Sequence, residues 1–302
     1  MLPTQVMLVE VGPRDGLQNE KEVVSTTNKV ELVHRLQAAG LRELEVTSFV
    51  SPKWVPQMAD GATVMAGVRR QPGVRYSVLV PNMKGLESAL PTRPDEIVVF
   101  GAASEAFSQR NINCSIAESI ERFRPVVAEA HKAGIKVRSA ISCALGCPYQ
   151  GEVSPDEVER VVQLMKDIGV DHCGIADTIG VGTPKRVQAA MERALKHYPL
   201  AEVSGHFHDT YGQALVNIYA CLELGIHVFD ASTSGLGGCP YAKGATGNVS
   251  MEDVVFMLNG LGIDTGVDLD LLVDAGAFIS GVLGRAPASR AGKALMAKRE
   301  GP

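Results

Sequence analysis

Short apolar segments alternate with amphipathic segments about eight times along this chain, and that alternation restricts the folds open to it. Period-two and apolar runs predict strands at 6–11, 43–49, 75–80, 96–102, 136–142, 172–176 and 228–233, with another strand carrying His206 and His208. Helical periodicity predicts helices at 28–39, 57–70, 84–90, 115–133, 154–168, 183–197, 213–224 and 251–258, and a further one at 269–283.

Eight strand–helix units with apolar strands favour a parallel sheet covered by helices, most simply a closed (β/α)8 TIM barrel with an additional C-terminal helix. The alternative is an open doubly wound sheet, which usually binds nucleotides through a Gly-rich loop after its first strand. The segment Gly12-Pro13-Arg14-Asp15-Gly16 does not fit that dinucleotide pattern. We expect a single barrel domain over residues 1–302, with 285–302 forming a loosely ordered tail.

The overall charge excludes several classes of function. The net charge of -5 argues against nonspecific nucleic-acid binding, and no apolar run is long enough to span a membrane. Six cysteines in 302 residues are too few for a disulfide scaffold and indicate a reducing compartment. The first residues resemble neither a secretory signal nor an amphipathic leader, so we expect a cytoplasmic protein of bacterial type that contacts neither nucleic acid nor membrane.

Two histidines lie two residues apart in the predicted seventh strand. Alternate side chains of a strand share a face, so His206 and His208 are expected to point the same way. The alternative is a pair of core or surface histidines whose ring nitrogens are satisfied by hydrogen bonds. At the exit of a strand, however, a His-x-His-Asp sequence favours half of a metal site that still needs oxygen ligands.

Polar residues gather where the predicted strands end, which is the face that carries the active site of a TIM barrel. They are Arg14, Asp15, Gln18 and Asn19 after the first strand, Glu45, Thr47 and Ser48 on the second, Asp177 and Thr178 after the sixth, and Asp209 beside the histidines. Asp15, His206, His208 and Asn248 would form a mixed oxygen and nitrogen ligand set. The oxygens favour Mg²⁺ or Mn²⁺ and the imidazoles favour Zn²⁺, so the sequence leaves the divalent metal open.

The segment 235–248 is rich in glycine and contains Cys239. Its glycines suit an active-site lid or, alternatively, a tight connection at the rim of a barrel. Cys239 could be a proton donor, a nucleophile or merely a small residue. Cys143 and Cys147 have no second pair at metal-ligand spacing, so we interpret them as packing thiols.

Four segments together resemble the hydroxymethylglutaryl-CoA lyase family. They are Val-Gly-Pro-Arg-Asp-Gly-Leu-Gln-Asn-Glu at 11–20, Ser-Phe-Val-Ser-Pro-Lys-Trp-Val-Pro-Gln at 48–57, His-Phe-His-Asp-Thr-Tyr-Gly at 206–212, and Gly-Leu-Gly-Gly-Cys-Pro-Tyr-Ala at 235–242. The resemblance extends from about residue 9 to residue 284. Related condensing synthases of the isopropylmalate and citramalate type share the Arg-Asp-Gly and His-x-His elements, but they are not expected to carry the Gly-Gly-Cys-Pro-Tyr-Ala loop.

The resemblance implies cleavage of 3-hydroxy-3-methylglutaryl-CoA to acetyl-CoA and acetoacetate, as in leucine degradation and ketone body formation. A divalent metal held by Asp15, His206, His208 and Asn248 would acidify the tertiary hydroxyl of the substrate. Asp15 or His206 would accept its proton. Arg14 would stabilise the enolate oxygen, and Cys239 would protonate the acetyl-CoA carbanion.

Several further residues are implied as substrate contacts: Arg14, Gln18, Glu45, Ser48, Asp177 and Thr178. The expected partner is a small CoA thioester, and a homo-oligomer, most simply a dimer, is expected. A lyase for a related 3-hydroxyacyl-CoA and a condensing synthase remain the alternative activities. A barrel that only binds a metabolite is disfavoured, because none of the polar residues needed for chemistry is missing.

Overall fold

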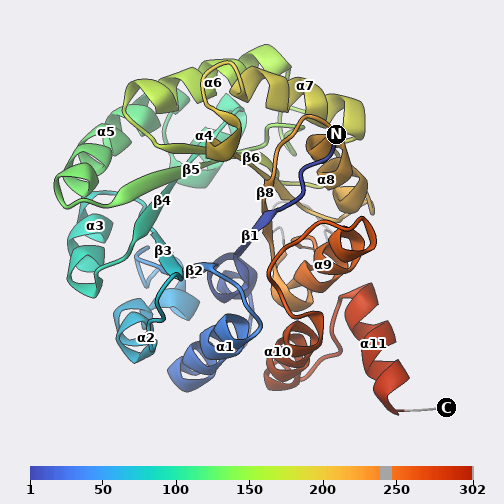
Figure 1. The fold of residues 1–302 in the computed structure, drawn as a ribbon. Coiled ribbons are helices and arrows are strands. Elements are labelled where there is room, and N and C mark those ends of the chain that lie inside the picture. The colour runs from blue at the N-terminus through green and yellow to red at the C-terminus, as the bar shows by residue number, and fades with distance from the viewer. Residues whose placement is uncertain (239–246, 301–302) are drawn as a thin grey trace.

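The computed structural model of the chain is a closed barrel whose strands run in sequence order from β1 to β8, each parallel to the next, with β8 pairing back onto β1 (Figure 1). The structure describes residues 1–238 and 247–300. The strands are β1 (Met7–Glu10), β2 (Glu43–Ser48), β3 (Arg75–Leu79), β4 (Glu96–Ala102), β5 (Lys136–Ser142), β6 (His172–Asp177), β7 (Val203–Phe207) and β8 (Val228–Ala231). The predicted (β/α)8 barrel is confirmed, and the open sheet is wrong.

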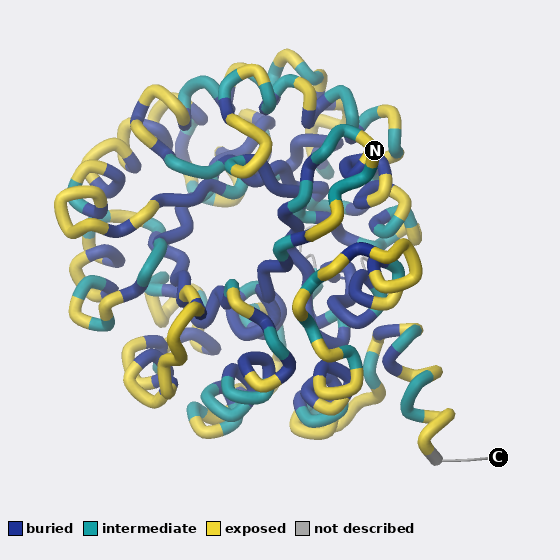
Figure 2. The backbone as a smooth tube through the Cα atoms, in the orientation of Figure 1, coloured by how far each residue is buried: buried dark blue, intermediate teal, exposed yellow. Residues whose placement is uncertain are grey.

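Helices form an outer ring around the strands (Figure 1). They are α1 (Thr26–Ala38), α2 (Gly61–Gly67), α3 (Met83–Ala89), α4 (Glu105–Ile112), α5 (Ile116–Lys132), α6 (Pro155–Asp167), α7 (Pro184–Ala194), α8 (Ala214–Glu223), α9 (Met251–Gly260), α10 (Leu269–Val282) and α11 (Arg290–Glu300). Buried segments line the inner side of this ring, and the exposed ones face outward (Figure 2). No helix in these ranges is long and apolar enough to cross a membrane.

Local sequence signals explain where several helices begin. Ser115 and Ser154 each accept a hydrogen bond from the backbone N–H of a glutamate three residues later, and that glutamate bonds back to the serine N–H. These capping boxes satisfy two of the free N–H groups at the start of α5 and α6. The Ser154 cap is the one that the sequence predicts.

The structure differs from the sequence prediction in several elements outside the barrel strands, most of all in α4 and in the tail at 285–302. Helix α4 is absent from the prediction because it is short and mostly polar; Ser104 caps it by accepting from Phe107 N–H. The tail at 285–302, expected to be loosely ordered, contains α11. The Ser289 hydroxyl caps α11 by accepting Gly292 N–H at 2.8 Å, and Asp253 in the first turn of α9 accepts hydrogen bonds from that hydroxyl and from Ala291 N–H, so a neighbouring helix supports the cap.

The interior of the barrel carries an unusual number of charged groups. Glu10, Glu45 and Arg138 point inward from strands and are at most 6% exposed. Buried charges are tolerated only when they are paired or hydrogen-bonded. Each of these three side chains therefore needs a partner, and residues towards the carboxyl end of the barrel provide it.

Candidate metal centre

The turn after β1 positions the first acidic ligand. One π-helical turn at Gly12–Gly16 follows the strand, and it places Arg14 and Asp15 over the barrel mouth. Arg14 donates two hydrogen bonds to Glu45 on β2, with Nε–Oε1 and Nη2–Oε2 distances of 2.7 and 3.0 Å. Its third nitrogen, Nη1, lies 2.6 Å from Asp15 Oδ1. This two-point contact with Glu45 fixes the guanidinium plane and, through it, Asp15.

Both histidines face Asp15 from β7 and the residue that follows it. Their ring centroids are 5.5 Å apart, and the ligand atoms of Asp15, His206 and His208 all lie within 4.8 Å of one another. His206 Nε2 is 4.0 Å from Asp15 Oδ2. The predicted convergence of these three side chains is confirmed, since they form a group able to hold a metal ion.

Asn248 reaches the same place from the opposite end of the sequence. It pairs with His208 in an isolated antiparallel bridge, and Val249 N–H donates to Phe207 C=O at 3.0 Å. The Asn248 side-chain nitrogen donates to Asp15 Oδ2 at 2.8 Å and to Leu236 C=O at 3.2 Å. As a metal ligand, Asn248 would have to turn its amide over to present the oxygen.

The pKa values of the two histidines are shifted in opposite directions. Burial and the neighbouring His206 lower the pKa of His208 to about 4, so its ring is neutral at neutral pH. Burial alone would lower the pKa of His206 as well, but a hydrogen bond to Asp230 and the charge of that carboxylate raise it. Burial disfavours ionised Asp15, yet Arg14 and the histidines outweigh burial and hold its pKa well below the usual range.

A divalent cation fits this set of donors. Asp15 is ionised and His208 is neutral, which are the forms that bind metals. The Nδ1 atom of His208 is buried and has no hydrogen-bond partner in the described part of the chain, although buried polar atoms are nearly always bonded. A metal ion would provide the partner that this nitrogen lacks.

The remaining predicted substrate residues fall into two groups. Gln18 lies in the site, where its side-chain nitrogen donates to Asp15 Oδ1 at 3.1 Å, and the buried Ser48 hydroxyl lacks a partner within 1–238 and 247–300. The other group is engaged within the protein. Both Glu45 oxygens bind Arg14, both Asp177 oxygens accept backbone N–H groups of Val181 and Gly182, and the Thr178 hydroxyl accepts Cys143 N–H.

Asp230 and Glu10 are site residues that sequence reasoning missed. Asp230 Oδ2 lies 3.2 Å from His206 Nδ1, and Glu10 accepts the N–H groups of Gly12 and Thr233. The available signal was an acidic residue at an inward position of a predicted strand, which has to be explained by a partner. Cys239, the predicted acid, lies outside the described residues.

Comparisons with known proteins identify the family of the chain. A family model described as HMGL-like matches residues 5–279. A protein of Pseudomonas aeruginosa named 3-hydroxy-3-isohexenylglutaryl-CoA/hydroxy-methylglutaryl-CoA lyase is 58% identical over 297 residues, covering 98% of this chain and 99% of that protein. The human mitochondrial hydroxymethylglutaryl-CoA lyase is 51% identical over 293 residues, covering 97% of this chain and 90% of its own length.

Solved structures give the same picture. The crystal structure of hydroxymethylglutaryl-CoA lyase from Pseudomonas aeruginosa superposes with a TM-score of 0.96 at 58% identity, covering 98% of this chain and 99% of that one. An HMG-CoA lyase from Acinetobacter baumannii, solved with coenzyme A and 3-methylmalate, superposes with a TM-score of 0.92 at 34% identity, covering 96% and 95%.

Proposed function

The chain belongs to the HMGL-like family, and from this premise we propose that it is a carbon–carbon lyase that cleaves 3-hydroxy-3-methylglutaryl-CoA into acetyl-CoA and acetoacetate. The single observation that carries the proposal is the meeting of Asp15, His206 and His208 at the carboxyl end of the barrel. This is the position at which TIM-barrel enzymes hold their reacting groups.

We assign the metal-binding role to Asp15, His206 and His208, with Asn248 as a fourth ligand once its amide turns. A divalent cation bound there would acidify the substrate hydroxyl and orient the substrate. Enzymes of this family depend on a metal. We favour Mg²⁺ or Mn²⁺ over Zn²⁺, because carboxylate, amide and substrate oxygens together suit a hard ion.

The proton of the tertiary hydroxyl has two candidate acceptors. Asp15 is held by Arg14, Gln18 and Asn248, whereas His206 is backed by Asp230. A His206 that holds the metal on one nitrogen and a proton on the other has no lone pair left, so it could act only by leaving the metal. Asp230→Asn at saturating Mn²⁺ separates the two: the pH profile of turnover shifts if His206 is the acceptor and keeps its shape if Asp15 is.

Arg14 is placed to stabilise the thioester oxygen as it becomes an enolate. The guanidinium is 7% exposed and fixed by Glu45, so it is pre-organised for charge that develops next to it. Cys239 is the proposed proton donor to the acetyl-CoA carbanion. In the sequence it lies between Gly238 and Pro240, after β8.

A second substrate is favoured by the name of one relative. The Pseudomonas aeruginosa lyase is named for both an isohexenylglutaryl and a methylglutaryl thioester. We therefore propose that the same site of this chain also accepts thioesters with longer branched acyl groups. Turnover of the two thioesters at equal concentration measures the preference.

The experiment that tests the function uses purified full-length protein with 3-hydroxy-3-methylglutaryl-CoA and Mg²⁺ or Mn²⁺. Equimolar acetyl-CoA and acetoacetate are expected, and EDTA should abolish their release. A metal-replete, folded sample that forms neither product contradicts the proposal.

We also expect a cytoplasmic homo-oligomer, most simply a dimer. The mass measured by light scattering will give the number of subunits.

A further inference from the structure

The charged groups below the candidate metal centre form a connected chain that the proposed function leaves unexplained. Asp230 on β8 uses one carboxylate oxygen, Oδ2, to face His206 Nδ1 at 3.2 Å. Its other oxygen, Oδ1, accepts a hydrogen bond from Arg138 on β5. The same Arg138 nitrogen donates to the Ser204 hydroxyl at 3.0 Å. A guanidinium on the far wall of the barrel is thus linked to a proposed metal ligand through a single carboxylate.

The strand register explains why Arg138 can reach that far. His206 and Asp230 are register partners on adjacent strands. Arg138 pairs with His172, which is four residues before Ala176, the register partner of His206. The guanidinium therefore has to extend towards the carboxyl end. Two residues further along, the paired positions are Ala140 on β5 and Gly174 on β6. Neither residue extends beyond Cβ, so the guanidinium has room to pass.

Arg138 is buried in its charged form. It is 6% exposed, and Asp230, Glu96 and Glu45 surround it closely enough for their charges to outweigh the effect of burial and raise its pKa. Asp230 likewise stays ionised: burial would raise its pKa, but Arg138 and His206 lower it to about 2. Two buried ions of opposite charge in contact hold each other in one geometry, and removing either leaves the other uncompensated.

We propose that Arg138 is a positioning residue of the metal site, acting through Asp230 to fix the ring of His206. The proposal rests on the metal site of the proposed function. With a carboxylate oxygen facing Nδ1, the network assigns the proton to Nδ1 and leaves the Nε2 lone pair directed at Asp15. Arg138 holds that carboxylate in place from the opposite side, so His206 meets a metal ion already oriented and in the correct tautomer.

The test measures Mn²⁺ binding to metal-free, full-length protein by the electron paramagnetic resonance signal of the free ion. Arg138→Met keeps much of the side-chain volume and removes the charge and the donors. We expect its Mn²⁺ dissociation constant to rise roughly 10- to 100-fold, the usual effect of losing the support of a metal-bound histidine. Arg138→Lys retains a charge and a donor, and we expect it to restore most of the affinity.

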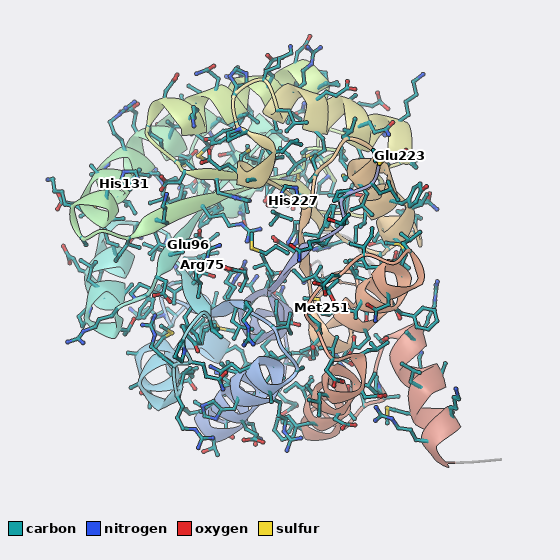
Figure 3. The ribbon with its side chains drawn as sticks, in the orientation of Figure 1. Arg75, Glu96, His131, Glu223, His227 and Met251 are labelled. Atoms are coloured by element: carbon teal, nitrogen blue, oxygen red, sulfur yellow. The ribbon has the colours of Figure 1, made fainter. Side chains whose placement is uncertain are left out.

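Arg75→Met is the matched control. Arg75 lies beside Glu96 (Figure 3) and pairs with Glu43, and it is close enough to Arg138 for their charges to interact, but no hydrogen bond or ion pair in the described part of the chain joins it to Asp230. Its side chain is 48% exposed, so its replacement removes a nearby guanidinium without touching the chain to His206, and the Mn²⁺ affinity should stay within about twofold of the wild type. Ser204→Ala, which removes the second partner of Arg138, should have an equally small effect.

A second readout separates positioning from mere stability. In ¹⁵N-histidine spectra of metal-free protein, the wild type should show His206 protonated at Nδ1, and Arg138→Met should show a mixture of the two tautomers. If Arg138→Met does not fold, Asp230→Asn keeps the side-chain size and removes the charge. It should weaken Mn²⁺ binding to a similar degree, and adding Arg138→Lys to it should weaken binding no further.

The outcomes are distinguishable. Wild-type affinity in folded Arg138→Met, or in Asp230→Asn where Arg138→Met fails to fold, would overturn the inference and leave the proposed function standing. So would an Arg75→Met variant that loses as much affinity as Arg138→Met. A wild-type chain that binds no Mn²⁺ would overturn the metal site itself, and this inference with it.

Discussion

Asp15 is the most heavily restrained side chain of the site. One of its oxygens accepts from Arg14 and Gln18, and the other accepts from Asn248 and lies 4.0 Å from His206 Nε2. Each of these groups favours the ionised carboxylate. A metal ion would therefore meet an anion that is already formed and oriented.

Arg14→Gln should impair both turnover and stability. Arg14 is the buried counter-charge of Glu45 and Asp15, so its loss leaves two carboxylates without their cation. We expect turnover to fall at least 100-fold, roughly 3 kcal/mol in transition-state stabilisation, and the melting temperature to drop by several degrees. Steady-state kinetics and thermal denaturation of the same preparation check this. A variant with unchanged kcat would remove Arg14 from the mechanism.

Cys239→Ser should separate turnover from metal binding. A hydroxyl is a much weaker acid than a thiol, so proton delivery to the carbanion should slow while the metal ligands stay intact. We expect a large fall in kcat with Mn²⁺ affinity near the wild-type value. Cys143→Ser is the control, because Cys143 lies in the loop after β5 and no step is assigned to it. Loss of Mn²⁺ binding in Cys239→Ser would contradict the assigned role.

At the residue scale, the sequence was informative where residues are adjacent and weak where they meet only in space. The His-x-His spacing and the Arg-Asp pair are local patterns, and the structure brings Asp15, His206 and His208 together as predicted. Asp230 and Arg138 are single residues on different strands, 92 positions apart in the sequence. Their link depends on strand register, which no local pattern encodes.

Two buried glutamates connect the elements that carry the site. Glu10 on β1 accepts from Gly12 N–H at 2.7 Å and from Thr233 N–H beyond β8 at 2.9 Å. Glu252 in the first turn of α9 accepts from Ser234 N–H and from the Ser250 hydroxyl, at 2.9 and 2.6 Å. Burial raises the pKa of Glu10 to about 8 and that of Glu252 to about 7. Adjacent peptide groups at 233 and 234 are thus held by two acids that titrate near neutrality.

These acids should make stability depend on pH. The folded chain binds their protons more tightly than the unfolded chain, whose glutamates titrate near pH 4.5. Their contribution is therefore complete below about pH 4.5 and is lost as the pH rises towards 8. Glu10→Gln, which cannot ionise, should lack part of this decline. We expect its unfolding free energy to fall less than that of the wild type between pH 5 and 8, by roughly 2 kcal/mol.

Chemical denaturation at each pH measures that difference. Glu31→Gln, on the outer face of α1 in an exposed pair with Arg35, is the control and should follow the wild-type curve. Parallel curves for Glu10→Gln and the wild type would mean that Glu10 is ionised throughout this range.

The elements themselves were largely predictable, because barrel strands are apolar and their helices are amphipathic. The predicted bounds of β4 and β5 agree with the structure to the residue. The predicted helix at 57–70 is shorter in the structure, as α2 at Gly61–Gly67, since a separate turn at Pro56–Met58 precedes it. Helix α11 was not predicted because the tail is basic and rich in small residues, although Ser289, whose hydroxyl accepts Gly292 N–H at 2.8 Å, is a local helix-start signal.

Closure of the barrel is what assembles the site at the scale of the whole molecule. Asp15 and Asn248 are 233 residues apart, yet their side chains are hydrogen-bonded because β8 pairs with β1. Parallel strands put their carboxyl ends on one rim, so ligands from the first, seventh and eighth units meet there, Asn248 from the long connection between β8 and α9. The same closure brings Arg138 on β5 and Asp230 on β8 into contact inside the barrel, where Asp230 faces His206.

Metal dependence is the central claim, and one titration tests it most directly. Metal-free protein is titrated with Mn²⁺ while bound ion and acetoacetate release from 3-hydroxy-3-methylglutaryl-CoA are followed together, for the wild type and for His208→Ala. We expect one ion per chain, activity that rises in proportion to bound ion, and loss of both in His208→Ala. Full cleavage by the metal-free protein, or unchanged Mn²⁺ binding in His208→Ala, would contradict it.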